Sequence, residues 1–280
     1  MFHILKKFFL LFLLLSGLIF TNCSKKENII KKPEKILPLT VLYNDAFSLF
    51  ENGNWTESIE KFQKVETRYS FSEWAPRATL MIIYIYYEAG QHFQTLEYIN
   101  KYKKLYPKNI NINYVDFIRA MTFYEQITIT SRDQTYAVQA MKEFNQIIKK
   151  YPNSRYAEES KLKIDLVKEQ LAGKEMYIAR FYMKKSKWIA AIKRLKIIIN
   201  DYDTTVYSEE ALHRLVEIYY KLGNIKESKK YAAFLGYNFN DGTWYKKTYK
   251  IVGDRNYKLE QEKTKKKLRN RIIEIFKFSK

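Results

Sequence analysis

An internal repeat is the feature that most restricts what this chain can fold into. Large apolar residues recur at intervals of 38, 43, 52 and 37 residues, and we expect each to open the second helix of a helix pair. These residues are Trp55, Phe93, Tyr136, Trp188 and Ile225. Glycine precedes three of them, at Gly53, Gly90 and Gly223, where it allows a tight turn between two helices.

A second mark closes each of the first four units. It is a tyrosine followed by a polar or turn-forming residue, at Tyr69-Ser70, Tyr106-Pro107, Tyr151-Pro152 and Tyr202-Asp203. Within the units apolar residues recur three and four positions apart, as in helices that bury one face, and one pair cannot bury such a face alone. The sequence therefore predicts an all-α solenoid of about five tetratricopeptide-like helix pairs over residues 39–252, with a concave inner surface. The intervals exceed the ~34 residues of that repeat, so extended helices or insertions are expected.

The N-terminal segment is typical of a signal peptide. Lys6 and Lys7 precede a largely apolar run from Phe8 to Phe20, which is shorter than the ~20 residues of a spanning helix. The sole cysteine follows in Ile19-Phe20-Thr21-Asn22-Cys23, which resembles a bacterial lipoprotein cleavage box. We expect residues 1–22 to be removed, Cys23 to carry acyl groups such as palmitate, and residues 23–38 to form a flexible tether. An ordinary secretory signal or an uncleaved anchor is the alternative.

The charge balance is strongly basic, with 50 Lys and Arg against 30 Asp and Glu and a formal net charge of +20. Such a balance can favour nucleic acids or membranes, but a chain rich in Lys, Ile and Asn also results from AT-rich coding. An exported lipoprotein meets little nucleic acid, so we expect no nucleic-acid partner.

The C-terminal segment concentrates this charge, with 13 Lys and Arg against 4 acids from Tyr245 onward. We expect residues 253–280 to form a basic helix or tail. It would either dock on anionic lipids or an acidic partner, or remain solvated.

Residues suited to catalysis or metal binding are scarce. The three histidines are isolated from one another, the single cysteine excludes a cysteine-based zinc site, and the glycines are too dispersed for a phosphate-binding loop. The acid pairs Glu158-Glu159 and Glu209-Glu210 stand at predicted helix starts, where the helix dipole favours negative charge. We therefore expect no enzyme activity, no cofactor and no metal.

Several segments follow the pattern of one protein family. They are Glu51-Asn52-Gly53-Asn54-Trp55, Arg68-Tyr69-Ser70-Phe71, Ile83-Tyr84-Ile85-Tyr86-Tyr87, Asn111-Ile112-Asn113-Tyr114-Val115, Ile118-Arg119-Ala120, Ser131-Arg132-Asp133, Tyr151-Pro152-Asn153-Ser154-Arg155-Tyr156-Ala157 and Leu235-Gly236-Tyr237-Asn238, the last followed by Trp244-Tyr245 and Tyr249. They resemble the BamD family, the lipoprotein component of the outer-membrane β-barrel assembly machinery. The resemblance spans roughly Val41 to Val252, although Asn240 and Gly242 replace residues that are usually Pro and Ser.

The resemblance implies a lipid-anchored protein at the periplasmic face of the outer membrane. In the family, C-terminal repeats bind a periplasmic domain of the barrel-forming assembly protein, N-terminal repeats engage unfolded outer-membrane proteins, and accessory lipoproteins join the complex. Within Trp188-Ile189-Ala190-Ala191-Ile192-Lys193-Arg194, Arg194 matches the arginine at the contact with the barrel protein. A planar guanidinium suits that role because it can bind a carboxylate through two parallel hydrogen bonds; a solvated surface arginine is the alternative.

The candidates for a substrate groove are aromatic residues expected on the first helices of the early units: Tyr84, Tyr87, Tyr114 and Phe117. An extended, aromatic-ended strand would bury its aromatic side chains against them. A different function remains open, because repeats alone do not specify a partner. It is that of a generic tetratricopeptide lipoprotein of the envelope, which would scaffold pilus-secretin or cell-division assembly.

Overall fold

The computed structural model describes residues 37–253, and within that range the secondary structure is entirely helical. The helices are α2 (Leu39–Glu51), α3 (Trp55–Arg68), α4 (Trp74–Glu88), α5 (His92–Leu105), α6 (Ile112–Tyr124), α7 (Thr135–Lys150), α8 (Arg155–Lys184), α9 (Trp188–Asp201), α10 (Tyr207–Lys221), α11 (Ile225–Asn238) and α12 (Thr243–Val252). The predicted signal peptide, Cys23 and the basic tail beyond Gly253 lie outside the described residues. The chain divides at Val41–Leu42, and the packing discussed below is that of the unit from Leu42 onward.

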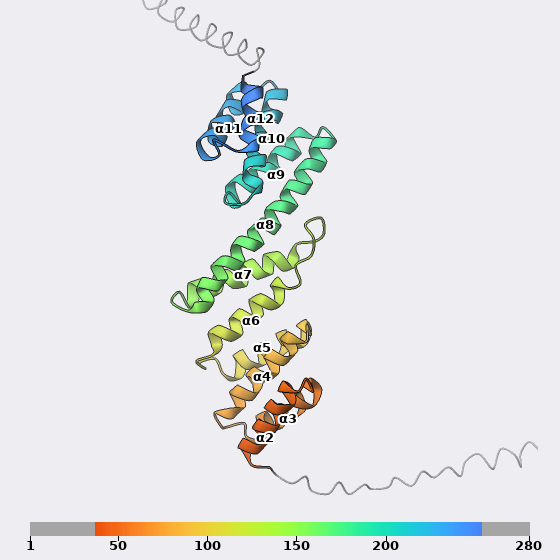
Figure 1. Cartoon of the computed structure of the whole chain (residues 1–280), viewed down its shortest axis with the longest axis vertical. Helices are drawn as coiled ribbons and strands as arrows, with labels where there is room; N and C mark the ends of the chain where they lie inside the picture. Colours follow the sequence, from red (N-terminus) through yellow and green to blue (C-terminus); the bar gives the residue numbers. More distant parts are fainter. Residues whose placement is uncertain (1–36, 254–280) are drawn as a thin grey trace, which may run out of the picture. The chain divides into compact units, whose positions relative to one another are not determined.

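Five helix pairs, α2–α3, α4–α5, α6–α7, α8–α9 and α10–α11, make up this unit, with α12 added at the end. Consecutive helices pack side by side from α3 to α12, as Figure 1 shows. Each pair buries its apolar stripe against the next pair, which is the packing that the repeat predicts. The all-helical class and the number of pairs are confirmed.

In four of the five pairs, a residue with left-handed backbone geometry lies in the turn between the two helices. Three-residue turns join their helices, and the middle residue of each turn has a positive φ, at 77° for Gly53, 66° for Gly90, 54° for Ser186 and 71° for Gly223. Glycine adopts this conformation without a side-chain clash, which confirms the role predicted for the three glycines. Ser186 occupies the equivalent place in the fourth pair and is the only non-glycine residue with a positive φ among those described.

In each of the five pairs, the second helix ends at an aromatic residue. The C-cap residues are Tyr69, Tyr106, Tyr151, Tyr202 and Phe239. In each case the backbone N–H of the cap donates to the carbonyl four residues earlier, and the cap's carbonyl accepts from the N–H three residues later. The tyrosine marks in the sequence are therefore helix ends. Phe239 is a fifth such mark, which the sequence pattern did not reveal.

Helix α8 accounts for the longest interval between repeats because it contains 30 residues. Its N-terminal half, up to Leu171, packs in a core cluster with α6 and α7, and from Ala172 onward it packs in a second cluster with α9, α10 and α11. Gly173 lies near the change from one cluster to the other. A Cβ atom there would stand 2.8 Å from Thr130 Cγ2 and 3.0 Å from the Tyr207 hydroxyl, so these two side chains would have to shift to admit a larger residue.

Buried carboxylates connect neighbouring helices. Glu66 of α3 accepts a hydrogen bond from the Thr79 hydroxyl of α4 at 2.8 Å and pairs with Lys101 of α5 at 2.7 Å. Asp116 of α6 accepts from the Tyr151 hydroxyl at the end of α7 at 2.9 Å. A buried carboxylate needs such partners to offset the loss of hydration. These contacts explain how a stack of helix pairs can carry acids in its core.

Candidate functional site

Aromatic side chains from the first helices of successive pairs form what we call the aromatic row: Phe50, Tyr84, Tyr87, Tyr114 and Tyr156. Phe50 of α2 and Tyr84 of α4 pack edge to face, with ring centroids 5.8 Å apart. Tyr114 of α6 and Tyr156 of α8 pack with centroids 5.6 Å apart. An edge-to-face contact such as that of Phe50 and Tyr84 stabilises an aromatic pair beyond the area it buries, while the rings of Tyr114 and Tyr156 are tilted by 44°. The row is therefore an ordered surface that crosses four helix pairs.

The hydroxyls of Tyr84, Tyr87 and Tyr114 in this row stay protonated, because the pKa of each is raised. Burial raises the pKa of Tyr114 to about 12, and the neighbouring Tyr84 adds to the rise. The pKa of Tyr87 is also raised, first by burial and then by its hydrogen bond to Glu125, the residue that ends α6. Each phenol can thus donate a hydrogen bond while its ring offers apolar area. Of the predicted groove residues, Tyr84, Tyr87 and Tyr114 are half-buried and lie together.

Phe117 departs from the prediction that it lines an open groove. Its exposed fraction is 7%, and its ring packs against Phe144 of α7 and Tyr156 of α8. The physical reason is its position on the side of α6 that faces those two helices. Phe117 supports the aromatic row from within the core and contributes little to its surface.

Arg155 ends the aromatic row with a positive charge. It is the first residue of α8, its guanidinium lies 4.8 Å from the centroid of the Tyr156 ring, and Nη2 donates to the Tyr156 hydroxyl at 2.9 Å. The side chain is exposed. Arg155 and Tyr156 belong to a family-like segment of the sequence, but their position next to Tyr114 is visible only in the structure.

Arg194, the predicted partner-binding residue, lies on α9 and pairs with Glu175 of α8. Its Nη1 atom is 3.1 and 3.3 Å from the two carboxylate oxygens of Glu175. The arginine side chain is 38% exposed and that of Glu175 is 17% exposed. Among the described residues, Nη1 is the only nitrogen of this guanidinium that makes a hydrogen bond. The remaining N–H groups can therefore still serve a carboxylate of another protein.

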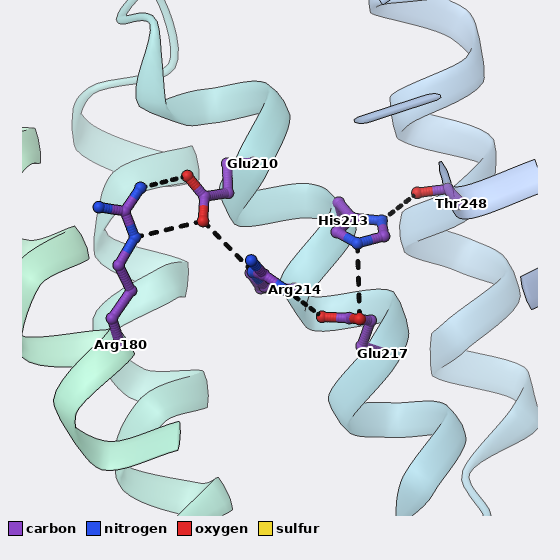
Figure 2. Close-up of polar contacts among 6 residues, drawn as sticks. All are labelled: Arg180, Glu210, His213, Arg214, Glu217 and Thr248. Atoms are coloured by element: carbon purple, nitrogen blue, oxygen red, sulfur yellow. Dashed lines mark hydrogen bonds and ion pairs between the residues drawn. The ribbon is translucent and has the colours of Figure 1, made fainter. Parts of the chain in front are cut away.

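A polar network connects α8 and α10 near this region. Glu210, buried in the first turn of α10, accepts hydrogen bonds from Arg180 of α8 and from Arg214 one turn further along α10 (Figure 2). Arg214 in turn donates to Glu217 at 2.7 Å. Glu210, which the sequence pattern predicted to interact with the helix dipole, therefore also pairs with two arginines.

The network continues into α12 through His213. The imidazole is buried, its Nδ1 atom lies 2.7 Å from the Thr248 hydroxyl of α12, and its Nε2 atom lies 3.6 Å from Glu217 (Figure 2). Burial alone would raise the pKa of Glu217, but hydrogen bonds with His213 and Arg214, together with their charges, lower it to about 2. Glu217 is consequently ionised at neutral pH. His213, which the sequence presented as an isolated residue, connects α10 to α12.

Glu209 completes the connection by capping α12. Its Oε1 atom accepts the backbone N–H groups of Trp244 at 2.9 Å and Tyr245 at 3.1 Å. A Cβ atom on Gly242 would lie 2.0 Å from the same oxygen, so the absence of a side chain there permits the cap. The predicted capping role of Glu209 thus extends to a second helix, 35 residues further along the chain.

The described part of the chain offers no arrangement suited to a metal ion, since no three His, Cys, Asp or Glu side chains are grouped for one between residues 37 and 253. In the same range, no helix combines the length and apolar character needed to cross a bilayer. Three features stand out in this range: the aromatic row, the partly exposed Arg194, and helix α12 held by Glu209 and His213.

Comparison with known proteins places these features in a family. The model of a family described as YfiO, outer membrane lipoprotein, matches residues 37–235. The outer membrane protein assembly factor BamD of Rickettsia prowazekii is 38% identical over 245 residues, which cover 88% of this chain and 96% of that protein. The protein of the same description from Caulobacter vibrioides is 38% identical over 227 residues, covering 80% of this chain and 74% of the relative. That from Vibrio cholerae is 28% identical over 223 residues, covering 75% and 91%.

Solved structures similar to this chain include a thermophilic tetratricopeptide-repeat protein of Thermus thermophilus. It is 15% identical, with a TM-score of 0.35, and the match covers 77% of this chain and 98% of that one. The type IV pilus biogenesis factor PilW is 13% identical, with a TM-score of 0.34, covering 75% and 97%.

Proposed function

The chain belongs to the YfiO family of outer membrane lipoproteins, to which the outer membrane protein assembly factor BamD belongs, and from this premise we propose that it is a non-catalytic scaffold of the outer-membrane β-barrel assembly complex. It acts at the periplasmic face of the outer membrane, anchored through acyl groups on Cys23. The observation that carries the proposal is the identity to the Rickettsia protein, because it extends over nearly the whole of both chains. The similarity therefore covers the whole series of helix pairs and is not limited to a single repeat.

The C-terminal pairs are the proposed site for the barrel-forming assembly protein. Arg194 keeps N–H groups available while Glu175 restrains its guanidinium, which favours binding of a carboxylate in a defined orientation. The network of Glu210, Arg180 and Arg214 keeps α8 and α10 together behind this site. A rigid arginine loses less conformational entropy on binding than a free one.

The N-terminal pairs are the proposed site for unfolded outer-membrane proteins. The aromatic row offers ring faces and phenol donors in sequence along α4 and α6, which suits an extended chain that ends in aromatic residues. Its half-buried tyrosines are already ordered by contacts such as that of Tyr87 with Glu125. Accessory lipoproteins of the complex would bind other faces of the scaffold.

The partner is tested by charge reversal at Arg194. A C-terminally tagged chain is solubilised from native envelopes in mild detergent, and the co-purifying proteins are quantified for the wild type, Arg194→Glu and Arg77→Glu. Arg77 is a matched control because it is an exposed arginine in an ion pair on α4. We expect a β-barrel assembly protein with the wild type and the control, and a loss with Arg194→Glu. Its absence from all three would favour the generic envelope scaffold.

The substrate site is tested with a fluorescent peptide from the C-terminus of an outer-membrane protein that ends in an aromatic residue. The double substitution Tyr84→Ala with Tyr114→Ala should weaken binding about tenfold or more, because two ring contacts are lost. Tyr136→Ala with Tyr177→Ala removes two exposed tyrosines elsewhere and should leave binding unchanged. Thermal unfolding of each variant verifies the fold. Equal binding by both double variants would exclude the aromatic row as the substrate site.

A further inference from the structure

A groove between α11 and α12 remains outside the sites described above. Small residues line its α11 side, at Ala232, Ala233 and Gly236, and the rings of Tyr245 and Tyr249 line its α12 side. Its volume is about 320 Å³, enough for one or two side chains of another molecule. The α12 side of the groove is fixed in place, because Glu209 and His213 of α10 bind α12 at two places along its length.

One lysine lines this groove, and further lysines are exposed on its two helices. From Ile225 to Gly253 the chain contains six lysines and two acids, Glu227 and Asp241. Lys229 lines the groove, and Lys226, Lys246 and Lys250 are exposed on the same two helices. Within residues 37–253, none of these four lysines forms an ion pair. Unpaired like charges around a concave apolar surface repel one another and favour an anionic ligand.

We propose that this groove binds an acidic segment of a partner protein. The segment places an apolar side chain against Ala233 and Gly236 between the tyrosine rings, and its carboxylates contact the lysines at the rim. The groove lies on α11 of the last pair and on α12, and it goes beyond the proposed function because it uses neither Arg194 on α9 nor the aromatic row on α2 to α8.

Charge also argues against two other occupants. The chain's own residues 254–280 contain 10 Lys and Arg against 4 acids, so they would bring like charge to the lysine rim. A second copy of the chain would bring a net charge of +20 toward the same rim. Like-charge contact is unfavourable in both cases. An acidic segment of another protein is the occupant that neutralises the rim.

Site-specific photo-cross-linking in native envelopes tests the proposal directly. The full chain carries a photo-reactive phenylalanine at Ala233, an exposed groove residue, or at Leu162 on α8 as a control away from the groove. Mass spectrometry then identifies the attached peptide. We expect Ala233 to cross-link a net-acidic segment of another protein that Leu162 does not reach. Attachment to residues 254–280, to a second copy, to lipid alone or to nothing would overturn the proposal.

Charge-reversal variants identify the part that the lysines play. Lys229→Glu with Lys250→Glu should reduce the acidic cross-link about tenfold, since two attractive contacts become repulsive. Lys142→Glu with Lys161→Glu makes the same change in net charge on exposed positions of α7 and α8, and should leave the cross-link unchanged. An equal reduction by both pairs would show a non-specific effect of charge and would overturn the site.

Two further arms separate this site from the Arg194 contact and from a lipid-binding surface. Arg194→Glu should leave the yield of the Ala233 cross-link at the wild-type level. The cross-link therefore tests the groove even if the proposed contact of Arg194 with the barrel protein proves wrong. Vesicles of phosphatidylglycerol and of phosphatidylcholine are compared for binding of the purified chain. If Lys229→Glu with Lys250→Glu abolished binding to phosphatidylglycerol while leaving the cross-link intact, the groove would be a lipid site and the proposal would be wrong.

Discussion

Arg194 on α9 and Glu175 on α8 form an ion pair in which Nη1 lies 3.1 Å from a carboxylate oxygen. Both side chains are partly exposed, so the pair adds little to stability, typically ~0–1 kcal/mol. Its main effect is on orientation, because a single nitrogen of the guanidinium is engaged and the rest is presented outward. The arrangement supports the proposed role of Arg194 in binding a partner, and that role can be tested.

Removal of the charge on Glu175 should leave the partner contact intact. In Glu175→Gln the amide oxygen can still accept from Arg194 Nη1 and restrain the guanidinium, while the competing negative charge is lost, so recovery of the barrel assembly protein should equal or exceed that of the wild type. The change in unfolding free energy should be under about 1 kcal/mol. Co-purification and urea unfolding measure the two effects. If Glu175→Gln lost the partner to the same degree as Arg194→Glu, the arginine would act by bracing α8 against α9.

Gly242→Ala should release α12 from its cap. The new Cβ would lie 2.0 Å from Glu209 Oε1, which must then leave the N–H groups of Trp244 and Tyr245. Loss of such a charged cap costs about 1–2 kcal/mol. Hydrogen exchange at those two amides should accelerate in Gly242→Ala and in Glu209→Ala. Glu209→Gln keeps an acceptor and should show a smaller effect; unchanged protection in all three would refute the cap.

Ser186→Gly should stabilise the protein. Ser186 has a φ of 54° at a turn position where three other pairs have glycine, and a side chain is strained there by about 1 kcal/mol. A gain of that size raises Tm by roughly 2–4 °C in a domain of this length. Thermal unfolding checks it, with Ser131→Gly in the loop before α7 as a control that should lower or not change Tm. A decrease in Ser186→Gly would mean that the serine makes a compensating contact.

Acid should destabilise the fold partly through Glu217. Its pKa in the folded protein is about 2, against an ordinary value of 4.5. Because the folded pKa is the lower one, this stabilisation is present above pH 4.5 and is lost as the pH falls toward 2. The urea midpoint of the wild type should therefore fall more steeply over this range than that of Glu217→Gln. The exposed Glu60→Gln provides the control, and parallel curves for all three proteins would contradict the prediction.

Local signals in the chain were sufficient to predict the repeat, the turns at Gly53, Gly90 and Gly223, and four of the five helix ends. A positive φ at Gly53 or a C-cap at Tyr69 depends on interactions among residues a few positions apart, so it leaves a local mark that can be recognised. The resemblance of Tyr151-Pro152 and its neighbours to one family rested on the same kind of local signal. The intervals longer than a tetratricopeptide repeat predicted extended helices or insertions, and the 30-residue α8 is an extended helix.

Contacts between residues far apart in the sequence depend on tertiary packing, and the sequence did not predict them. Glu209 caps a helix 35 residues further along the chain, and His213 reaches Thr248 over the same separation. Phe117 is buried, while Tyr114, one helical turn earlier, remains half-exposed. Such outcomes depend on the rotation and crossing of helices, which the packing of whole faces sets. A periodic pattern specifies that a face is buried, but the partner of each side chain follows from how neighbouring pairs stack.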